Sequence, residues 1–192
     1  MGKNNQVSAL VVQAQAGNTD SFGQLVEIYQ NKIYGLCFKL TGNHSDAEDL
    51  AQEAFIKAYQ KLHTFRQEAD FGTWMHRITI NLYLNKKKKD SRMELSYIDA
   101  PLKTEEGQLE REIADPESDP LREVTRKETS SLIHTALNHL KPEHKLVLVL
   151  REIEGYSYEE IAQLTESSLG TVKSRMNRAR TALKQYLSKQ KL

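Results

Sequence analysis

The chain has 192 residues and a formal net charge of +1, with 39% hydrophobic and 28% charged residues. No run of residues approaches the ~18 consecutive apolar positions of a membrane-spanning helix, so the composition excludes a transmembrane protein. The single cysteine, Cys37, cannot form an intrachain disulfide, and the amino terminus lacks the apolar stretch of a secretory signal. We therefore expect a cytoplasmic protein of one domain or two small ones, rather than a disulfide-rich scaffold or a zinc ribbon.

Charge is distributed unevenly along the chain. Residues 1–89 carry 11 basic and 8 acidic side chains, residues 90–129 carry 6 and 12, and residues 130–192 carry 10 and 6. Two basic segments around an acidic one suggest polyanion contacts at both ends. The acidic segment also holds three of the four prolines, which is typical of an extended linker. We predict an N-terminal domain over 1–92, an acidic flexible linker over 93–122 and a C-terminal domain over 123–192.

Apolar residues in the first half recur with the helical period, and no segment alternates as a strand does. Four helices are expected, over about residues 7–14, 22–40, 45–62 and 71–87. The apolar faces of the last three are formed by Phe22, Leu25, Val26, Tyr29, Ile33, Leu36, Cys37 and Leu40; by Ala47, Leu50, Ala51, Ala54, Phe55, Ala58 and Leu62; and by Phe71, Trp74, Met75, Ile78 and Leu82. The first half is therefore predicted to be a helical bundle.

Polar residues mark the ends of these predicted helices. Asp20 is a candidate N-cap for the second helix, and Gly42 can adopt the left-handed conformation after its last turn. Ser45 and Glu48 have the spacing of a capping box, which predicts that Ser45 begins the third helix.

The second half is also predicted to be helical. The first helix of this half is marked by the apolar residues Leu132, Ile133, Ala136, Leu137 and Leu140. The next helix begins near Pro142 and ends at Gly155, and its apolar residues are Leu146, Val147, Leu150 and Ile153. Ser157 and Glu160 form a second capping box for a short helix. A polar break then precedes a long final helix, whose inner face holds Leu169, Val172, Met176, Ala179 and Leu183. A short helix, a turn and a longer helix indicate a helix-turn-helix.

The final helix is the strongest candidate for DNA binding. Residues 167–192 contain seven basic side chains and no acidic ones. The outward positions near its start, with their flanks, are Thr171, Lys173, Ser174, Arg175, Asn177, Arg178 and Arg180. Asn, Arg and Lys can read base edges in the major groove. The alternative is a solvated basic face, which the preceding capped helix and turn make less attractive.

The helix over 45–62 carries a mixed outer strip with an apolar centre and acidic edges. It consists of Asp46, Glu48, Asp49, Gln52, Glu53 and Ile56. Acidic residues near a helix start can simply complement the helix dipole, which accounts for Asp46 and Glu48. That explanation does not cover Asp49, Glu53 or an outward Ile56, which together fit a docking surface for a basic partner.

A third candidate site combines a loop with a lysine run. His63, Thr64, Phe65 and Arg66 precede a helix that ends in four lysines from Lys86 onwards. Aromatic and cationic side chains together can stack and hold single-stranded bases. A solvated helix end explains the lysines equally well, and the periodicity assigns Trp74 to the core.

No pattern in the chain indicates an enzyme. His134, His139 and His144 are spaced by five residues, which is not the spacing of helical metal ligands. There is no glycine-rich phosphate loop, nucleophile elbow or zinc-protease motif. We therefore expect no catalytic residue, no bound metal and no cofactor.

Three stretches together resemble the extracytoplasmic-function class of bacterial sigma factors. They are DAEDLAQEAFIKAY at 46–59, FRQEADFGTWMHRITINLYLN at 65–85 and GYSYEEIAQLTESSLGTVKSRMNRARTAL at 155–183. The resemblance implies an all-helical initiation factor of two small domains that binds core RNA polymerase and opens promoter DNA. It also implies partners: the clamp helices of the largest polymerase subunit, the flap of the second-largest subunit, and an anti-sigma factor that can hold the chain at the inner face of the membrane.

The resemblance assigns roles to individual residues. The 46–59 stretch matches the polymerase-docking helix, which carries the six residues of the mixed outer strip. The 65–85 stretch matches the segment that captures the melted minus-ten element. In this match Phe65, Arg66 and Asn81 lie at the flipped-base pocket, and Asn85 and Lys86 lie near the DNA backbone. His63 and Thr64 directly precede the stretch. The final helix matches the reader of the minus-thirty-five element. Many relatives have proline at the position of Ser168, so the start of that helix is open from sequence alone.

Two other function classes compete with this interpretation. An ordinary helix-turn-helix regulator would bind an operator without polymerase and would not need an acidic docking strip. A helical nuclease could use Asp46, Asp49 and Glu53 on a metal, but one exposed helix face lacks the convergence of ligands that a metal cleft requires.

Overall fold

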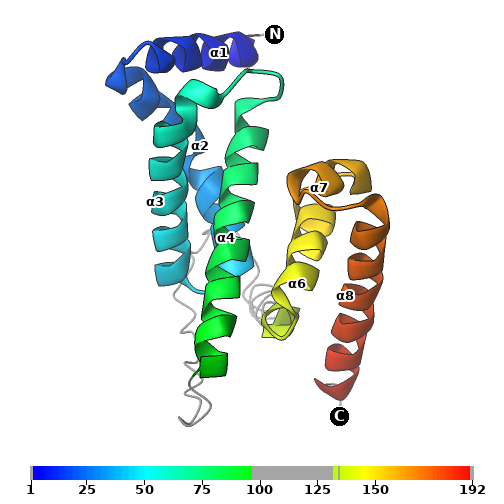
Figure 1. Ribbon diagram of the computed structural model, residues 1–192. Coiled ribbons are helices and arrows are strands. Elements are labelled where there is room, and N and C mark those ends of the chain that lie inside the picture. Colours follow the sequence, from blue (N-terminus) through cyan, green and yellow to red (C-terminus); the bar gives the residue numbers. More distant parts are fainter. Residues whose placement is uncertain (1, 97–131, 134, 191–192) are drawn as a thin grey trace, which may run out of the picture.

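The computed structural model describes residues 2–96, 132, 133 and 135–190 (Figure 1). The N-terminal half contains α1 (Gly2–Gln15), α2 (Thr19–Thr41), α3 (His44–Lys61), the 3-10 turn η1 (Leu62–Thr64) and α4 (Phe71–Ser96). The C-terminal half contains α6 (Pro142–Leu148), the π-helical turn η2 (Val149–Ile153), α7 (Tyr158–Leu164) and α8 (Leu169–Gln190), and residues 132, 133 and 135–138 are helical as well. Over these described residues there is no strand, as the sequence predicts.

Helices α2, α3 and α4 form a bundle, and α1 lies across one of its ends (Figure 1). The apolar faces predicted from periodicity are the ones that pack. On α3 the buried residues are Ala47, Leu50, Ala51, Ala54 and Ala58. Their small size lets α3 approach its neighbours closely, while larger side chains from α2 and α4, including Leu25, Ile33 and Met75, fill the centre.

Two helix starts differ from the sequence prediction. The N-cap of α2 is Asn18, whose side chain accepts a hydrogen bond from the Ser21 amide, and Asp20 lies inside the first turn. The N-cap of α3 is Asn43, which accepts from the Asp46 amide; Ser45 is already helical. In both cases an asparagine two residues upstream provides the cap, so the Asp20 cap and the Ser45–Glu48 capping box are wrong.

Helix α4 is longer than predicted. It continues to Ser96 instead of ending near Lys87, so residues 93–96 of the predicted linker are helical, and residues 97–122 lie outside the described part. Lysine is a good helix former, and two ion pairs support the extension. Lys86 bonds Asp46 on α3 at 2.8 Å, and Lys87 lies 3.7 Å from Asp90 one turn further on.

The C-terminal half follows the predicted order. Pro142 occupies the first turn of α6, and Gly155 has a φ of +79° after η2. The capping box at the start of α7 is confirmed: the Ser157 side chain accepts from the Glu160 amide, and the Glu160 carboxylate accepts from the Ser157 amide. Leu146–Leu150 are buried, and Ile161, Leu164, Val172 and Met176 join them in the core.

Three apolar residues assigned to helices by their spacing are exposed. Leu132, Ile133 and Ile153 each leave 40–47% of their surface open, whereas Ala136, Leu137 and Leu140 are buried as expected. Periodicity identifies a helical face, but only the arrangement of neighbouring helices decides how far along the chain that face is covered.

The two halves of the chain are in contact. Helix α4 packs against α6 and α7, and α2 packs against α6 (Figure 1). At the end of α2, Gly42 has a φ of +91°, and a Cβ at this position would lie 2.5 Å from Oδ1 of Asn138 in the C-terminal half. Glycine at position 42 therefore meets two requirements. It adopts the left-handed conformation that ends α2, and its missing Cβ leaves room for Asn138 of the other half.

We predict that Gly42→Ala destabilises the chain more than Gly155→Ala. Both residues have positive φ, which costs an alanine roughly 1–2 kcal/mol, but a Cβ at Gly155 meets nothing within 4 Å. At Gly42 the Asn138 side chain must also move, and Asn138 accepts a hydrogen bond from Lys145. Chemical denaturation of the two variants measures the difference. Equal losses would show that the contact with Asn138 contributes nothing.

Candidate nucleic-acid interface

The outer strip of α3 is exposed as the sequence predicts. Glu48, Asp49, Gln52, Glu53 and Ile56 all face solvent, and Ile56 leaves 54% of its surface open. The structure adds Tyr59, one turn beyond Ile56 and 49% exposed, whose ring packs edge-on against Phe22 at 4.9 Å between centroids. The spacing of Ile56 and Tyr59 signals this pair in the sequence. The α3 strip therefore has an apolar centre flanked by carboxylates.

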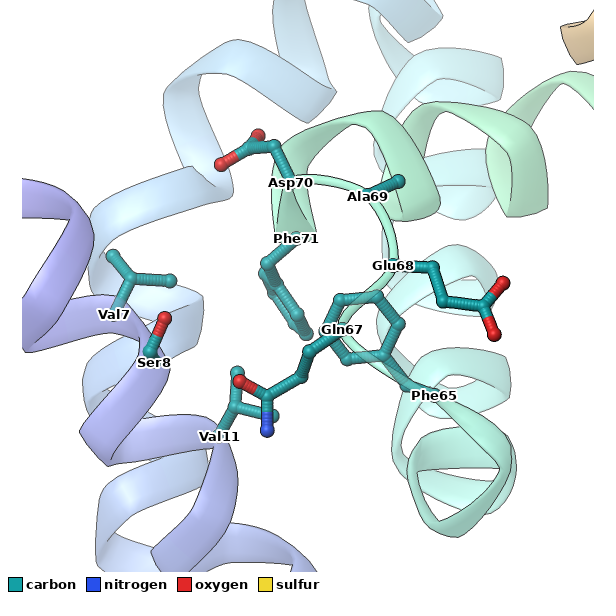
Figure 2. Close-up of a pocket in the computed structure, with 9 residues that line it drawn as sticks. All are labelled: Val7, Ser8, Val11, Phe65, Gln67, Glu68, Ala69, Asp70 and Phe71. Atoms are coloured by element: carbon teal, nitrogen blue, oxygen red, sulfur yellow. The ribbon is translucent and has the colours of Figure 1, made fainter.

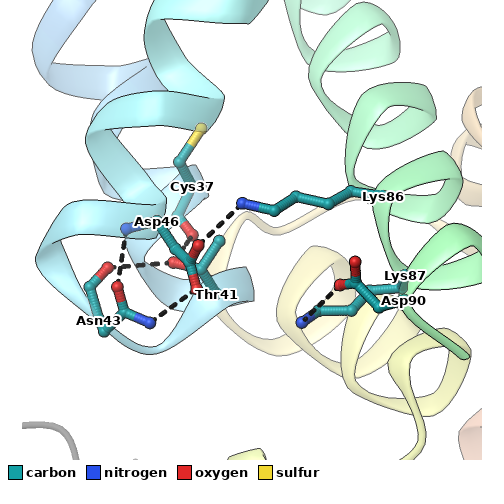
Figure 3. Close-up of polar contacts among 7 residues, drawn as sticks. All are labelled: Cys37, Thr41, Asn43, Asp46, Lys86, Lys87 and Asp90. Carbon is teal, nitrogen blue, oxygen red and sulfur yellow. Dashed lines mark hydrogen bonds and ion pairs between the residues drawn. The ribbon is translucent and has the colours of Figure 1, made fainter. Parts of the chain in front are cut away.

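Asp46 differs from the rest of the α3 strip because its carboxylate has partners within the chain. It accepts hydrogen bonds from Nζ of Lys86 and from Nδ2 of Asn43, both at 2.8 Å (Figure 3). These two bonds, that from Lys86 first, lower the pKa of the Asp46 carboxyl below its usual value. The same contact raises the pKa of Lys86. A residue predicted to dock a protein and a residue predicted to contact DNA are therefore paired with each other.

In the loop after η1, the structure buries one predicted base-contacting residue and exposes the others. Phe65 keeps only 7% of its surface, with its ring 4.9 Å from that of Trp74 and 5.7 Å from that of Phe71. His63, Thr64 and Arg66 are exposed, and the Thr64 hydroxyl donates to the carbonyl of Lys61. The Phe65 ring thus contributes to the core of this domain.

Next to this loop lies a cavity of about 220 Å³ between α1 and the start of α4 (Figure 2). It is lined by both apolar and polar residues: Val7, Ser8, Val11, Phe65, Gln67, Glu68, Ala69, Asp70 and Phe71. The Gln15 side chain of α1 donates to the carbonyls of Leu62 and Phe65, which ties the loop to α1. Gln67 has a φ of +56°, an uncommon conformation for a residue other than glycine.

The remaining predicted minus-ten residues lie further along α4. Asn81 and Asn85 are exposed and one turn apart, with Arg77 one turn before them on the same face. Asn81 is ten residues beyond Phe71, which places it ~15 Å along the helix axis from the loop. Neither Arg66 nor Asn81 lines the cavity. A single pocket formed by Phe65, Arg66 and Asn81 therefore stays a prediction.

The structure resolves the start of α8, which the sequence left open. The Ser168 hydroxyl accepts a hydrogen bond from the Thr171 amide at 3.1 Å, so a serine in place of proline still caps the helix. Ser168 also bonds the Thr171 hydroxyl. Of the predicted reading residues, Lys173, Ser174, Asn177 and Arg178 are exposed and Arg175 is half-buried. Arg180 bonds Glu152 at 2.6 Å.

Basic side chains of α8 reach over the start of α6. Burial is the first cause that lowers the pKa of His144, and Lys141, Arg178 and Arg175 lower it further, opposed by Glu143. Three cations and the acidic Glu143 thus act on His144 in opposite directions. His144 gives no signal of this in the sequence, because its neighbours on α8 are more than thirty residues away.

Two other kinds of site, a metal centre and a membrane-spanning helix, are absent from the described residues. In the part of the chain that the structure describes, no three histidine, cysteine or carboxylate side chains lie close enough to hold a metal ion. None of the helices in that part is long and apolar enough to cross a membrane.

Comparison with known proteins identifies the two halves separately. The sigma-70 region 2 family matches residues 25–93, and the sigma-70 region 4 family matches residues 130–183. The chain is 36% identical over 181 residues to the ECF RNA polymerase sigma factor SigW of Bacillus subtilis, covering 92% of this chain and 94% of that protein. It is 37% identical over 185 residues to the RNA polymerase sigma-H factor of Pseudomonas aeruginosa, covering 95% and 94%.

Two solved structures share the fold. One is the sigma factor RpoE in complex with the anti-sigma factor NepR from Bartonella quintana, with a TM-score of 0.64, 24% identity and coverage of 87% of this chain and 96% of that one. The other is CnrH in complex with the cytosolic domain of CnrY, with a TM-score of 0.61, 23% identity and coverage of 95% and 97%.

A helix-turn-helix half, a bundle half with an exposed acidic strip, and these relatives define the class of protein. The chain belongs to the extracytoplasmic-function (ECF) class of RNA polymerase sigma factors. It is a promoter-directing transcription initiation factor of two helical domains.

We predict that Lys86→Met raises the pKa of the Asp46 carboxyl toward its ordinary value, because it removes the stronger of the two hydrogen bonds. A carboxyl whose pKa is lowered by folding stabilises the native state above its unfolded pKa and loses that contribution as the pH falls. The wild type should therefore lose its advantage over Lys86→Met on acidification. NMR titration of the side-chain carboxyl measures the pKa, with Lys88→Met as control. The same pKa in all three proteins would contradict the pairing.

Proposed function

We propose that this sigma factor uses three separate surfaces to place polymerase on a promoter. The α3 strip docks on the clamp helices of the largest polymerase subunit. The loop after η1 and the exposed face of α4 bind the melted minus-ten element, and the first turns of α8 read the minus-thirty-five element. The observation that carries this proposal is the segregation of charge, with carboxylates around an apolar centre on α3 and basic side chains on α4 and α8. No catalytic residue, metal or cofactor is needed for these roles.

The composition of the α3 strip supports docking on a basic protein surface. Ile56 and Tyr59 offer apolar area at the centre, and Asp49 and Glu53 supply charge beside it. Interfaces of this kind gain affinity from the desolvated centre and specificity from the complementary charges around it. Asp46 would join them only by exchanging Lys86 for a partner on polymerase.

For the minus-ten element we propose capture of an unstacked base beside the η1–α4 loop. The cavity there is lined by Phe65 and Phe71 and by polar residues that include Ser8 and Gln67. Flipping a base costs a few kcal/mol, and stacking together with hydrogen bonds to the base edge offsets that cost. Arg66, Asn81, Asn85 and the lysines at 86–89 would hold the backbone of the same strand.

For the minus-thirty-five element we propose direct readout by Lys173, Ser174, Asn177 and Arg178 in the major groove. These four positions are exposed on the first three turns of α8. Thr171, Arg175 and Arg180 flank these four positions, and we assign them to contacts with DNA phosphates. The Thr171 hydroxyl is bonded to Ser168 and the Arg180 guanidinium to Glu152, so neither side chain is assigned to a base edge.

We also propose that the chain acts in the cytoplasm, that its C-terminal domain contacts the flap of the second-largest polymerase subunit, and that an anti-sigma factor restrains it. Two proteins of the same fold are described in complex with an anti-sigma factor or with the cytosolic domain of a partner. The direct test of the whole proposal is run-off transcription with purified core polymerase on a genomic library. Discrete start sites that appear only with this chain support it, and their absence refutes it.

The docking surface is tested by Asp49→Lys combined with Glu53→Lys. The double reversal should abolish co-purification with core polymerase, because it places positive charge against a basic surface. The matched control is Glu27→Lys with Glu159→Lys, which changes the net charge equally at exposed positions outside α3. Circular dichroism checks that both variants are folded. Binding of the α3 variant at the control level would refute the assignment.

The reading surface is tested by Arg178→Ala. A base-reading arginine should contribute roughly 1–3 kcal/mol of binding free energy on a promoter that carries its own base pair. It should contribute little on a promoter in which that base pair is changed. The control is Lys184→Ala, which removes one exposed positive charge two turns further along α8. Footprinting on promoter variants compares the two. An equal loss of affinity on every promoter would reassign Arg178 to a phosphate contact.

A further inference from the structure

Helix α1 packs on the part of the chain that leads into the proposed minus-ten loop. The buried face of α1 consists of Val7, Leu10, Val11 and Ala14. It belongs to the same apolar cluster as Leu62, Phe65 and Phe71, and α1 contacts η1 as well as α2. Because burial of this apolar face anchors α1, the polar side chains that α1 carries are held at fixed positions relative to the loop.

The end of α1 is fixed by a Schellman motif. The Asn18 amide donates to the carbonyl of Gln13 and the Gly17 amide to that of Ala14, both at 3.1 Å. Gly17 has a φ of +96°, which is the left-handed conformation that this motif requires. Gln15 lies in the last turn before Gly17, and Asn18 is the N-cap of α2. The backbone of Gln15 is therefore tied to the start of α2.

The Gln15 side chain joins α1 to the loop at two points. Its Nε2 donates to the carbonyl oxygen of Leu62 at 2.9 Å and to that of Phe65 at 2.8 Å. Leu62 is the first residue of η1, and Phe65 is its C-cap, where the backbone carbonyl has no partner within the helix. Gln15 therefore fixes the direction in which the loop leaves η1.

The other end of the loop is anchored independently of α1. The Asp70 carboxylate accepts a hydrogen bond from the Gly72 amide at 2.8 Å, and the Asp70 carbonyl accepts one from the Trp74 amide at 3.1 Å. Residues 66–69, between the two anchors, are exposed. The loop is thus held on α4 by Asp70 and on α1 by Gln15.

Helix α1 also forms one wall of the cavity beside this loop. Val7, Ser8 and Val11 line the cavity from α1, and the other lining residues belong to the segment 65–71 (Figure 2). A cavity of about 150 Å³ holds a benzene molecule, so the volume of about 220 Å³ found here is sufficient for the ring of one base. The separation of the two walls depends on how the loop is held on α1, and Gln15 makes that connection.

The charges at the cavity favour an uncharged occupant over a phosphate. Residues 2–15 of α1 include no acidic side chain. The acidic lining residues are Glu68, whose side chain points away from α1 (Figure 2), and Asp70, whose carboxylate is bonded to the Gly72 amide. Two carboxylates beside the cavity repel a phosphate. A base carries no charge, and the hydroxyl of Ser8 and the amide of Gln67 can bond its edge.

We propose that α1 is part of the minus-ten site: an unpaired base lies between α1 and the loop, and Gln15 is a positioning residue that holds the loop at the separation from α1 that the base needs. This inference rests on the proposed capture of a base by this loop, to which it adds a second wall. A pocket whose walls are fixed before DNA arrives loses less conformational entropy on binding, so more of the stacking energy offsets the cost of flipping.

The first experiment tests the positioning role in the free chain. Gln15→Glu keeps the size of the side chain but replaces its donor with a carboxylate, which the two carbonyls repel. The only tryptophan, Trp74, reports on the loop because its ring lies 4.9 Å from that of Phe65. Acrylamide quenching of Trp74 fluorescence should increase in Gln15→Glu and in the uncharged variant Gln15→Met.

The matched control for this experiment is Gln13→Glu. It adds the same charge to α1 two residues earlier, and its carboxylate can still accept the hydrogen bond that Gln13 accepts from the Ser21 hydroxyl. Quenching in Gln13→Glu should stay at the wild-type value, and circular dichroism checks that every variant is folded. If the two Gln15 variants are quenched like the wild type, Gln15 does not position the loop.

The second experiment measures base capture by the chain assembled with core polymerase. The probe is the single-stranded minus-ten DNA of a promoter mapped by run-off transcription, with an abasic nucleotide placed at each position in turn. In the wild type one position should weaken binding about tenfold or more, as expected for the loss of one stacked base.

The Gln15 variants should affect only the strand that carries the captured base. Gln15→Glu should weaken binding of the intact strand about five- to tenfold, as expected for the loss of two hydrogen bonds. It should leave binding of the strand that is abasic at the captured position unchanged. A purely structural role of Gln15 would weaken both strands equally, and that result would overturn the proposal.

The α1 wall is tested by Ser8→Phe. A phenyl ring at this position would occupy the cavity, so the difference in affinity between the intact and the abasic strand should disappear. The control is Ala9→Phe, which places the same ring at the neighbouring exposed position, outside the cavity lining. If Ser8→Phe and Ala9→Phe both retain the wild-type difference, α1 does not form a wall of the base pocket.

The outcomes separate this inference from the proposed function. If no abasic position weakens binding of the wild type, base capture by this loop fails, and the α1 wall fails with it, whereas Trp74 quenching still decides whether Gln15 positions the loop. If one position matters but neither Gln15→Glu nor Ser8→Phe changes its effect, base capture holds and α1 takes no part in it.

Discussion

Burial of helix α4 from two sides is the constraint on which the rest of this structure depends. One face of α4, with Phe71 and Met75, closes the N-terminal bundle, and the other, with His76 and Tyr83, meets the C-terminal half. Over residues 71–87 of α4, the exposed positions are Arg77, Asn81 and Asn85, which lie one turn apart on a strip between these faces. The same packing that holds the two halves together therefore decides which side chains of α4 are available to a nucleic acid.

Electrostatics connects the proposed sites more directly than their separation in the chain suggests. Asp46 lies in the first turn of the proposed docking helix and Lys86 in the segment proposed to bind the minus-ten element, yet the two form one ion pair. Half-exposed pairs of this kind contribute little to stability, but they determine which charges a partner meets first. A basic polymerase surface and a DNA phosphate would compete for opposite members of this pair. The proposed docking on α3 and the proposed contact of α4 with DNA would thus be linked through an exchange of partners.

The contact between the two halves combines an apolar core with ion pairs near solvent. Buried residues from both halves form one apolar cluster. Arg77 on α4 bonds Glu166 at 2.9 Å, and because both side chains are half-exposed or more, the pair contributes little to stability. The apolar contact therefore contributes more to this packing than the ion pair does.

The sequence by itself determined the helical class, the two domains and the family, because apolar periodicity, capping residues and three contiguous motifs are local properties. It also predicted the buried face of α3 and the exposure of Lys173, Ser174, Asn177 and Arg178 on α8, whereas Thr171 and Arg175 are half-buried. It misplaced the starts of α2 and α3, since Asn18 and Asn43 cap these helices two residues before Asp20 and Ser45. Only the tertiary structure decided the burial of Phe65, the partners of Asp46 and Arg180, and the contact between the halves. The pairs Asp46–Lys86 and Arg180–Glu152 and the contact between the halves join residues far apart in the chain, whose proximity no local pattern encodes. The burial of Phe65 depends on how its loop folds back onto Phe71 and Trp74.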